Sequence, residues 1–403
     1  MTWTLLHGDC RAVLATMDDG LIDAIVTDPP YELGFMGKAW DASGVAYSVG
    51  LWAEVLRVLK PGGHLLAFGG TRTYHRMTVA IEDAGFEVRD SIHWVYGSGF
   101  PKSLDVSKAI DKAAGAEREV IGDKAWNNSA ANFVPGEDHS QRIQLPITAP
   151  ATDAARQWDG WGTALKPAHE PIVVARKPLA GTVAANVLEY GTGALNIDGC
   201  RVAAPDGVPQ FEQKGQQSVG VHGDGLHGSL SLGVRDYSTG RWPANFVLTH
   251  AADCGDDCAP GCPVAALDEQ SGDGASRFFT VTEWDDAPFR YVAKPSRAER
   301  NAGTDRNIHP TVKPLDLMRW LVRLVTPPGG VVLDLFAGSG TTLASAILEG
   351  FDCVGVEMTD DYLPLIEGRC AWAEKAARFG PVTGRPKVDA DDTPTLFDVE
   401  EAS

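Results

Sequence analysis

Apolar and polar positions alternate regularly along the first hundred residues of the chain. Short apolar runs bounded by Gly, Pro or Asp predict buried strands, and apolar residues spaced three and four apart predict helices between them. The expected strands cover residues 4–6, 22–27, 64–70 and 86–97. The expected helices cover residues 11–17, 49–59 and 74–84, the second stopping at Lys-Pro-Gly-Gly. This alternation is typical of a mainly parallel sheet covered by helices.

The same alternation returns near residue 289, after a long interruption. Its expected strands cover residues 289–295, 331–336 and 352–358, and its expected helices cover 314–325, 341–348 and 360–377. Between the two regular parts, residues 98–287 are rich in Gly, Pro, Asn, Gln and Ser, a composition that forms a core poorly. Strand-like islands at 169–178 and 241–250 favour a partly ordered domain with mobile loops.

The chain is therefore expected to build one α/β sheet from two separated pieces, with a different domain inserted between them. The expected halves of the sheet domain are residues 1–100 and 289–378. The loop-rich insert is expected over 101–288, and an acidic, disordered tail over 379–403.

The composition is that of a globular protein. With 403 residues, 44% of them hydrophobic and 22% charged, the chain can form a large core. No apolar run is long enough to cross a bilayer and the first residues carry no basic flank, so we expect a cytoplasmic protein without a membrane partner. Seven cysteines, an odd number, make a complete disulfide framework unexpected. The net charge of −19 argues against nucleic acid, but residues 277–323 are locally rich in Arg and Lys, which permits a DNA-binding cleft.

A glycine-rich turn follows the expected strand at 331–336 and opens a helix, where free backbone N–H groups can meet a ligand. A phosphate-binding loop would need a lysine, which is absent, and Leu343 stands where a dinucleotide loop needs its third glycine. The turn instead resembles the S-adenosylmethionine loop of methyltransferases. The matching residues are Asp334, Phe336, Gly338 and Gly340, with Thr341 opening the helix. The next strand ends at Glu357, whose carboxylate can accept hydrogen bonds from ribose hydroxyls.

A second chemical signal is Asp28-Pro29-Pro30-Tyr31, directly after the expected strand at 22–27. It resembles the motif of methyltransferases that modify amino groups conjugated to a ring or a carbonyl. Such an amine is a poor nucleophile because its lone pair is delocalised. The Asp28 carboxylate and the Pro29 carbonyl can hold its two N–H groups and favour a more pyramidal nitrogen, while the prolines keep the corner rigid. Tyr31 is expected to stack on a base rotated out of the duplex.

The order of these motifs resembles the β class of DNA amino-methyltransferases, in which the catalytic motif precedes a target-recognition domain and then the cofactor region. The resemblance implies a Rossmann-like S-adenosylmethionine-dependent methyltransferase sheet with circularly permuted motif order. It implies that Asp28, Pro29, Pro30 and Tyr31 are catalytic, and that Asp28 also contacts the cofactor. It places Asp9 near the cofactor adenine, and Thr311, Lys313 and Pro314 along its methionine end.

The expected function is site-specific transfer of a methyl group from S-adenosylmethionine to the 6-amino group of a flipped adenine in double-stranded DNA. Members acting on cytosine often carry Ser in place of Asp28, so Asp28 favours adenine; cytosine 4-amino methylation stays open, as does a non-catalytic DNA-binding relative. Target recognition is expected within the insert. A homodimer and a cognate restriction endonuclease, as in restriction-modification, also stay open as partners.

Four side chains within the insert are possible ligands of a metal ion. They are His250, Cys254, Cys258 and Cys262. Such a set can hold a structural Zn²⁺, but an even spacing of four is unlike the usual two close and two distant ligands. Reduced thiols in a loop are the alternative.

Overall fold

The computed structural model describes residues 2–34, 42–96, 103–126, 143–201, 242–249, 258, 262–271, 280–282 and 297–378. The chain divides into two compact units, one formed by Met1–Ser98 with His169–Ser403 and the other by Gly99–Ala168. The expected strand at 289–295 and the expected tail at 379–403 lie outside the described residues. Within these residues, no helix is long and apolar enough to span a bilayer.

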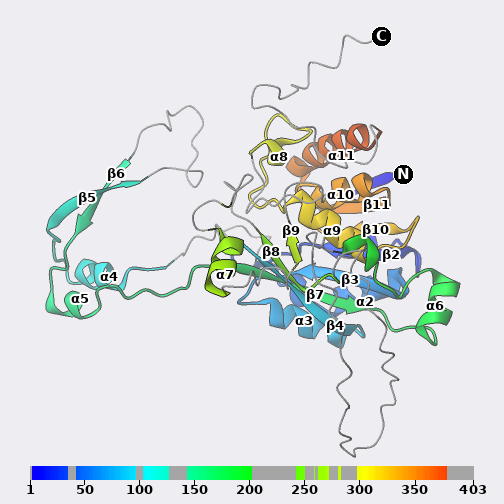
Figure 1. The fold of residues 1–403 in the computed structure, drawn as a ribbon, viewed down its shortest axis with the longest axis horizontal. Coiled ribbons are helices and arrows are strands. Elements are labelled where there is room, and N and C mark those ends of the chain that lie inside the picture. Colours follow the sequence, from blue (N-terminus) through cyan, green and yellow to red (C-terminus); the bar gives the residue numbers. More distant parts are fainter. Residues whose placement is uncertain are drawn as a thin grey trace, which may run out of the picture. The chain divides into compact units, whose positions relative to one another are not determined.

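The described residues of the larger unit form a nine-stranded sheet with the order β1-β11-β10-β2-β3-β7-β4-β8-β9 (Figure 1). The strands are β1 (Trp3–His7), β2 (Ile22–Thr27), β3 (Leu59–Phe68), β4 (Glu87–Val95), β7 (His169–Arg176), β8 (Phe246–Thr249), β9 (Thr280–Thr282), β10 (Val331–Asp334) and β11 (Asp352–Glu357). The first five in spatial order run parallel, whereas β7 is antiparallel to β3 and β4. The two regular parts of the sequence thus form one mostly parallel α/β sheet, which confirms the expected fold class.

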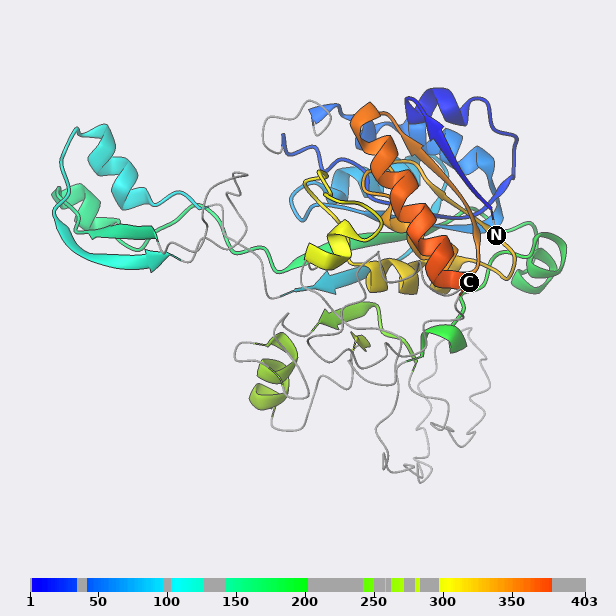
Figure 2. The same ribbon diagram turned by 90° about the horizontal axis from the view of Figure 1, so that it is seen from above.

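Helices cover both faces of this sheet (Figures 1 and 2). One buried cluster joins β2, β3 and β7 to α9 (Leu315–Val325), α10 (Thr341–Glu349) and α11 (Leu363–Arg378). The other joins the opposite face to α1 (Cys10–Leu14), α2 (Val49–Val58) and α3 (Tyr74–Asp83). Successive residues of a strand alternate between the clusters, so Val26 packs in the first and Ile25 in the second. The remaining helices of this unit are α6 (Val183–Tyr190), α7 (Pro263–Ser271) and α8 (Arg297–Asn301), with single 3-10 turns at Val45–Tyr47, Asp198–Cys200 and Asp360–Tyr362.

Strand β3 begins earlier than the sequence pattern predicts. Helix α2 ends at Val58, and Lys-Pro-Gly-Gly already belongs to β3. The reason is pairing across the sheet, since Gly62 N donates to Lys177 O at 3.1 Å and Lys177 N donates to Gly63 O at 2.9 Å. The backbone groups after the helix are therefore satisfied in a ladder rather than in a loop.

Part of the expected insert belongs to the sheet. Strands β7, β8 and β9 lie within residues 101–288, and β7 is inserted between β3 and β4. Its five residues Pro171–Ala175 are all buried, as expected of a strand covered on both faces. The boundaries of a target-recognition domain stay a prediction, and the separate compact unit is confined to Gly99–Ala168.

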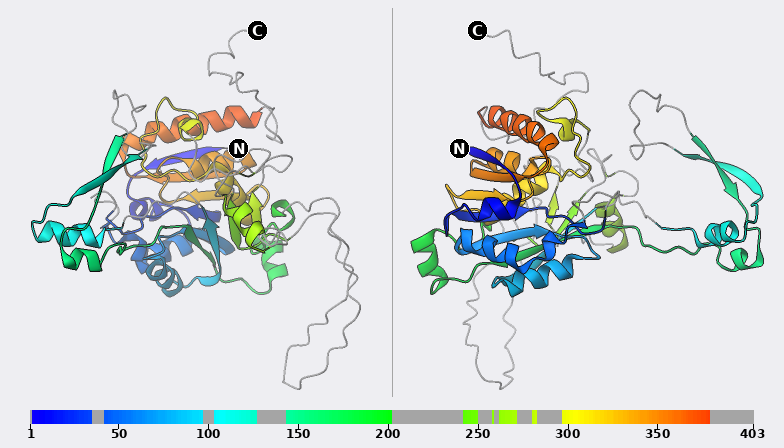
Figure 3. Two further views of the ribbon diagram at one scale, coloured as in Figure 1. Left: turned by 60° about the vertical axis from the view of Figure 1, so that its left-hand side comes forward. Right: turned by 180° about the vertical axis from the view of Figure 1, so that it is seen from behind.

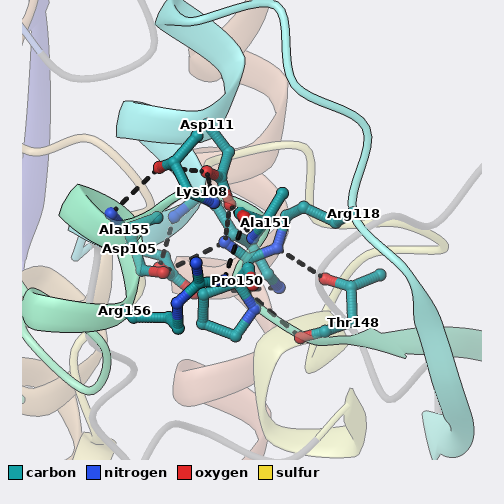
Figure 4. A network of polar contacts seen from close by, with 11 residues as sticks. Asp105, Lys108, Asp111, Arg118, Thr148, Pro150, Ala151, Ala155 and Arg156 are labelled. Atoms are coloured by element: carbon teal, nitrogen blue, oxygen red, sulfur yellow. Dashed lines mark hydrogen bonds and ion pairs between the residues drawn. The ribbon is translucent and has the colours of Figure 1, made fainter.

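The smaller unit contains a two-stranded antiparallel ribbon and two helices (Figure 3). Its elements are α4 (Val106–Ala113), β5 (Val120–Trp126), β6 (Ile143–Thr148) and α5 (Asp153–Gln157). At its centre, the buried Asp111 carboxylate accepts hydrogen bonds from Arg118, Ala151 and Thr152 (Figure 4). This polar centre links α4, the chain before β5 and the start of α5.

Candidate active site

The carboxyl edge of the parallel strands gathers residues from both ends of the chain. His7 pairs with Glu357 in register, and Leu333 pairs with Ile25, so β1, β11, β10 and β2 end side by side. The Thr27 hydroxyl donates to Asp334 Oδ1 at 2.7 Å, which ties the end of β2 to the end of β10. Ligands of open α/β sheets bind at this edge. The structure therefore brings the Asp28 corner and the glycine turn to neighbouring strand ends.

The glycine turn has the backbone shape that its sequence predicts. Gly338 and Gly340 have φ angles of 51° and 74°, in the left-handed region that favours glycine, and α10 starts directly after Gly340. Within residues 332–347, Phe336 and Gly338 alone are partly exposed and the others are buried. These two residues are thus the face that the turn offers to a ligand. A side chain at Gly338 would meet His309 Nε2 at 2.9 Å, so the protein itself also requires glycine there.

Glu357 closes the turn from the neighbouring strand. Its carboxylate, with only 8% of the residue exposed, accepts from Gly338 N through Oε2 and from Thr359 N through Oε1, both at 2.8 Å. Each carboxylate oxygen has a further lone pair, so these bonds leave capacity for hydroxyl donors. The expected contact with ribose hydroxyls stays a prediction.

Asp334 lies beneath the turn. It is 2% exposed, and Oδ1 accepts from Thr27 and from Phe336 N at 3.1 Å. Burial raises the pKa of Asp334 to about 6, although these hydrogen bonds act in the opposite direction. The carboxylate therefore shapes the loop through protein contacts.

The Asp28 carboxylate has one paired and one unpaired oxygen. Oδ2 lies 2.7 Å from Lys313 Nζ, whereas Oδ1 is buried and has no hydrogen-bond partner among the described residues. An unsatisfied buried acceptor costs about 1–3 kcal/mol, so such an atom indicates a position prepared for a donor. Pro29 is buried and Pro30 partly buried, which fixes the corner that carries this carboxylate.

Tyr31 is held from several sides. Its hydroxyl donates to Glu170 Oε2 at 2.8 Å and lies 3.0 Å from Lys313 Nζ, which donates to it. Its carbonyl accepts from the Thr73 hydroxyl at 2.8 Å. A side chain at Gly70 would meet the ring at 3.2 Å, so the glycine lets the ring pack closely. Burial raises the pKa of Tyr31 well above its ordinary value, and the charges of Asp28 and Glu170 act in the same direction.

Lys313 contacts the Asp28 corner. Besides Asp28 it meets Glu170 Oε2 at 3.2 Å, and its ammonium lies 4.8 Å from the centre of the Phe68 ring. Burial alone would lower the pKa of Lys313, but the charges of Asp28 and Glu170 outweigh it and raise the pKa above its ordinary value. A contact with the methionine end of a cofactor stays a prediction for this residue.

Glu170 is a site residue that the sequence analysis did not identify. It precedes the buried part of β7, and because β7 is antiparallel, its beginning lies at the carboxyl end of β3. Gly69 N donates to Pro171 O at 2.9 Å, which fixes this register. The only sequence signal is an acid followed by proline at a strand boundary, as at Asp28-Pro29.

The other expected site residues have local roles that the structure describes. Asp9 is the N-cap of α1, accepts from Arg11 N at 2.9 Å and forms an ion pair with Arg11. The Thr311 carbonyl contacts His309 Nδ1, and Pro314 is the residue before α9. Their contacts with a cofactor stay predictions.

The zinc prediction is not decided by the structure. His250 and Cys254 lie outside the described residues, while Cys258 is exposed and Cys262 is buried. Over the part of the chain that is described, no group of three or more His, Cys, Asp or Glu side chains could hold a metal.

This chain is similar to known proteins in sequence and in fold. It is 23% identical over 296 residues to the Type II methyltransferase M.HindIII of Haemophilus influenzae, covering 73% of this chain and 58% of that protein. It is 42% identical over 57 residues to the DNA adenine methyltransferase YhdJ of Escherichia coli, covering 14% and 19% of the two chains. A solved structure of the putative DNA modification methylase TTHA0409 of Thermus thermophilus, complexed with S-adenosyl-L-methionine, has a TM-score of 0.40 and 19% identity, covering 92% and 94%.

The most extensive sequence match is to a protein family. The family model of N6/N4 methyltransferases, described as DNA methylase, matches residues 22–368. This range contains the Asp28 corner, Glu170, Lys313 and the glycine turn, and extends through Glu357. The chain therefore belongs to the N6/N4 DNA methylase family.

Proposed function

We propose that this protein transfers a methyl group from S-adenosylmethionine to the 6-amino group of adenine in DNA. The observation that carries the proposal is the unpaired, buried Oδ1 of Asp28 at the same sheet edge as the glycine turn. The family allows both adenine and cytosine amines, and the aspartate, rather than a serine, at position 28 supports adenine.

The glycine turn and its neighbours suit S-adenosylmethionine as a ligand. Phe336 and Gly338 supply the partly exposed face of the turn, and Glu357 supplies a carboxylate with acceptor capacity for hydroxyl groups. The N-terminus of α10 adds the positive end of a helix dipole. These residues would hold the cofactor, which when bound supplies an electrophilic methyl group on a sulfonium.

The Asp28 corner would prepare the amine. Oδ1 accepts one N–H of the target amine and the Pro29 carbonyl accepts the other, which holds the nitrogen with its lone pair toward the methyl group. The bond between this nitrogen and the methyl carbon forms as the bond from sulfur to that carbon breaks. The nitrogen then carries the positive charge and an extra proton, and Asp28 Oδ1 can accept this proton. Positioning of this kind provides much of an enzyme's acceleration.

The test compares an aspartate within β2 with the one that follows this strand. Asp28 follows β2, and Asp23 lies near its beginning, where it pairs with Lys60 at 2.6 Å. We expect Asp28→Ala to lower the rate of radiolabelled methyl transfer to DNA by at least about a hundredfold. Calorimetry should show that S-adenosylmethionine binding survives, and Asp23→Asn should retain the wild-type rate while it stays folded.

The product identifies the base. Mass spectrometry of hydrolysed DNA should find N6-methyladenine, and N4-methylcytosine would instead show that the base assignment is wrong. Wild-type transfer rates in Asp28→Ala would contradict the role of Oδ1.

A further inference from the structure

Two acids and one base, Asp28, Glu170 and Lys313, form a charge cluster beside the unpaired oxygen of Asp28. Lys313 Nζ lies 2.7 Å from Asp28 Oδ2 and 3.2 Å from Glu170 Oε2. The side chains are 10% exposed for Lys313, 23% for Asp28 and 20% for Glu170. Charges in such a place interact strongly because little water screens them.

The sum of these charges depends on Glu170. Lys313 by itself would neutralise Asp28, and the charge cluster would have no net charge. With the Glu170 carboxylate, two carboxylates face one ammonium, and the cluster carries one net negative charge. Glu170 also gives Lys313 a second partner, so that the ammonium is shared between two carboxylates and occupies only one oxygen of Asp28.

The proposed reaction needs this negative charge. Methyl transfer moves a positive charge from the sulfur of the donor to the nitrogen of the target. An arrangement of charges already in place, which favours the charge where it develops, lowers the barrier without reorganisation. A neutral Asp28–Lys313 pair would provide much less of this stabilisation.

We propose that Glu170 is a positioning residue for the reaction: it balances the charge of Lys313, so that the Asp28 carboxylate faces the target amine as part of a net negative charge cluster. This inference rests on the proposed function and adds to it a residue on β7. Glu170 also holds Tyr31, whose hydroxyl donates to the same Oε2 at 2.8 Å.

The inference predicts non-additive effects of two substitutions. Glu170→Gln leaves the charge cluster neutral and should lower kcat by about tenfold to a hundredfold. Calorimetry should find the affinity for S-adenosylmethionine unchanged within about twofold, since the proposed role of Glu170 concerns the transfer step and not cofactor binding. Adding Lys313→Met to Glu170→Gln restores one net negative charge and should recover kcat severalfold relative to Glu170→Gln alone.

Two further variants separate this role from a structural one. Glu170→Asp keeps the charge and should stay within several-fold of the wild-type kcat, which also serves if Glu170→Gln folds poorly. Glu87→Gln removes a carboxylate that pairs with Arg176 at 2.6 Å at the other end of β7, and should leave kcat unchanged.

The outcomes are distinguishable. If the wild type methylates DNA and Glu170→Gln has the same kcat, or if the double variant is no faster than Glu170→Gln, this inference is wrong while the proposed function stands. If the wild type transfers no methyl group to DNA, the proposed function is wrong and the inference falls with it.

Discussion

Asp28, which is partly buried, and Asp111, which is buried, each contact a basic side chain, at 2.7 Å from Lys313 and 2.8 Å from Arg118, yet their surroundings differ. Asp111 accepts from Arg118, from Ala151 N and from both the amide and the hydroxyl of Thr152, so both of its oxygens are satisfied (Figure 4). Asp28 has one oxygen without a partner among the described residues.

The difference in hydrogen bonding indicates a structural role for Asp111 and a ligand-binding role for Asp28. A satisfied buried carboxylate organises the chain around it, and its removal leaves several donors unpaired. An unsatisfied one weakens the fold slightly and is retained where a ligand completes it. The partners also differ in their distance along the sequence. Those of Asp111 lie within about forty residues of it, whereas Lys313, the partner of Asp28, comes from the chain just before α9 and is reached only in the complete sheet.

The largest effect on stability is expected from removing the satisfied carboxylate. Asp111→Asn should weaken the centre of the unit Gly99–Ala168, because Arg118 and two backbone amides lose their charged acceptor. Hydrogen exchange should show protection in α4 and α5 falling by at least about tenfold. Asp153→Asn, which removes an exposed ion pair with Arg156 in the same unit, is the control and should change protection little. If both variants showed the same hydrogen-exchange protection in α4 and α5, the structural role that distinguishes Asp111 from Asp28 would be contradicted.

A second prediction tests the glycine turn, which follows the strand beside the one that ends before Asp28. In Gly340→Ala, the alanine would have to keep a left-handed φ of 74°, and its methyl group would lie 3.1 Å from Ile366 Cα. We expect the strained backbone alone to lower the free energy of unfolding by about 1–2 kcal/mol, and the contact with Ile366 to lower it further. We also expect weaker binding of S-adenosylmethionine. Gly350→Ala has a similar φ of 89° but nothing within 4 Å, so it should show the backbone cost without the loss of binding. Denaturant unfolding and calorimetry measure the two effects, and equal binding losses would contradict a special role for the turn.

The sequence predicted one side of the site better than the other. Asp28, the glycine turn and Glu357 each follow a parallel strand, and parallel strands end at one edge whatever their spatial order. Local pattern and strand direction were therefore enough for these residues. The strand end at Thr27 matches the structure, and β11 ends at Glu357, one residue before the end of the expected strand at 352–358, because apolar runs buried on both faces have sharp boundaries.

Glu170 could not be placed in this way. Its position depends on β7 running antiparallel between β3 and β4, and no local pattern in a segment surrounded by Gly- and Pro-rich sequence reveals that pairing. The contact of Lys313 with Asp28 depends on the same long-range assembly. Asp111 was hidden for a different reason: a polar residue in a short amphipathic helix usually faces water, and its burial depends on Arg118 and Thr152 closing over it.

The smallest expected effect concerns the influence of burial on charge, which acts on His64 in the same sheet that carries Asp28. His64 in β3 is 5% exposed, and burial, with smaller effects from Arg176 and Arg89, lowers its pKa to about 4. Between pH 6.5 and about 4, the unfolded chain therefore binds a proton there that the folded protein does not, so the free energy of unfolding decreases as the pH falls through this range. From pH 6.5 to 5.5 this group should contribute a loss of about 1 kcal/mol. His64→Gln should reduce the pH dependence measured by denaturant unfolding by that amount, whereas substitution of the exposed His75 serves as the control. An unchanged slope in His64→Gln would mean that burial in this sheet does not hold a titratable group neutral, and the contrast between the two aspartates would then rest on their hydrogen bonds alone.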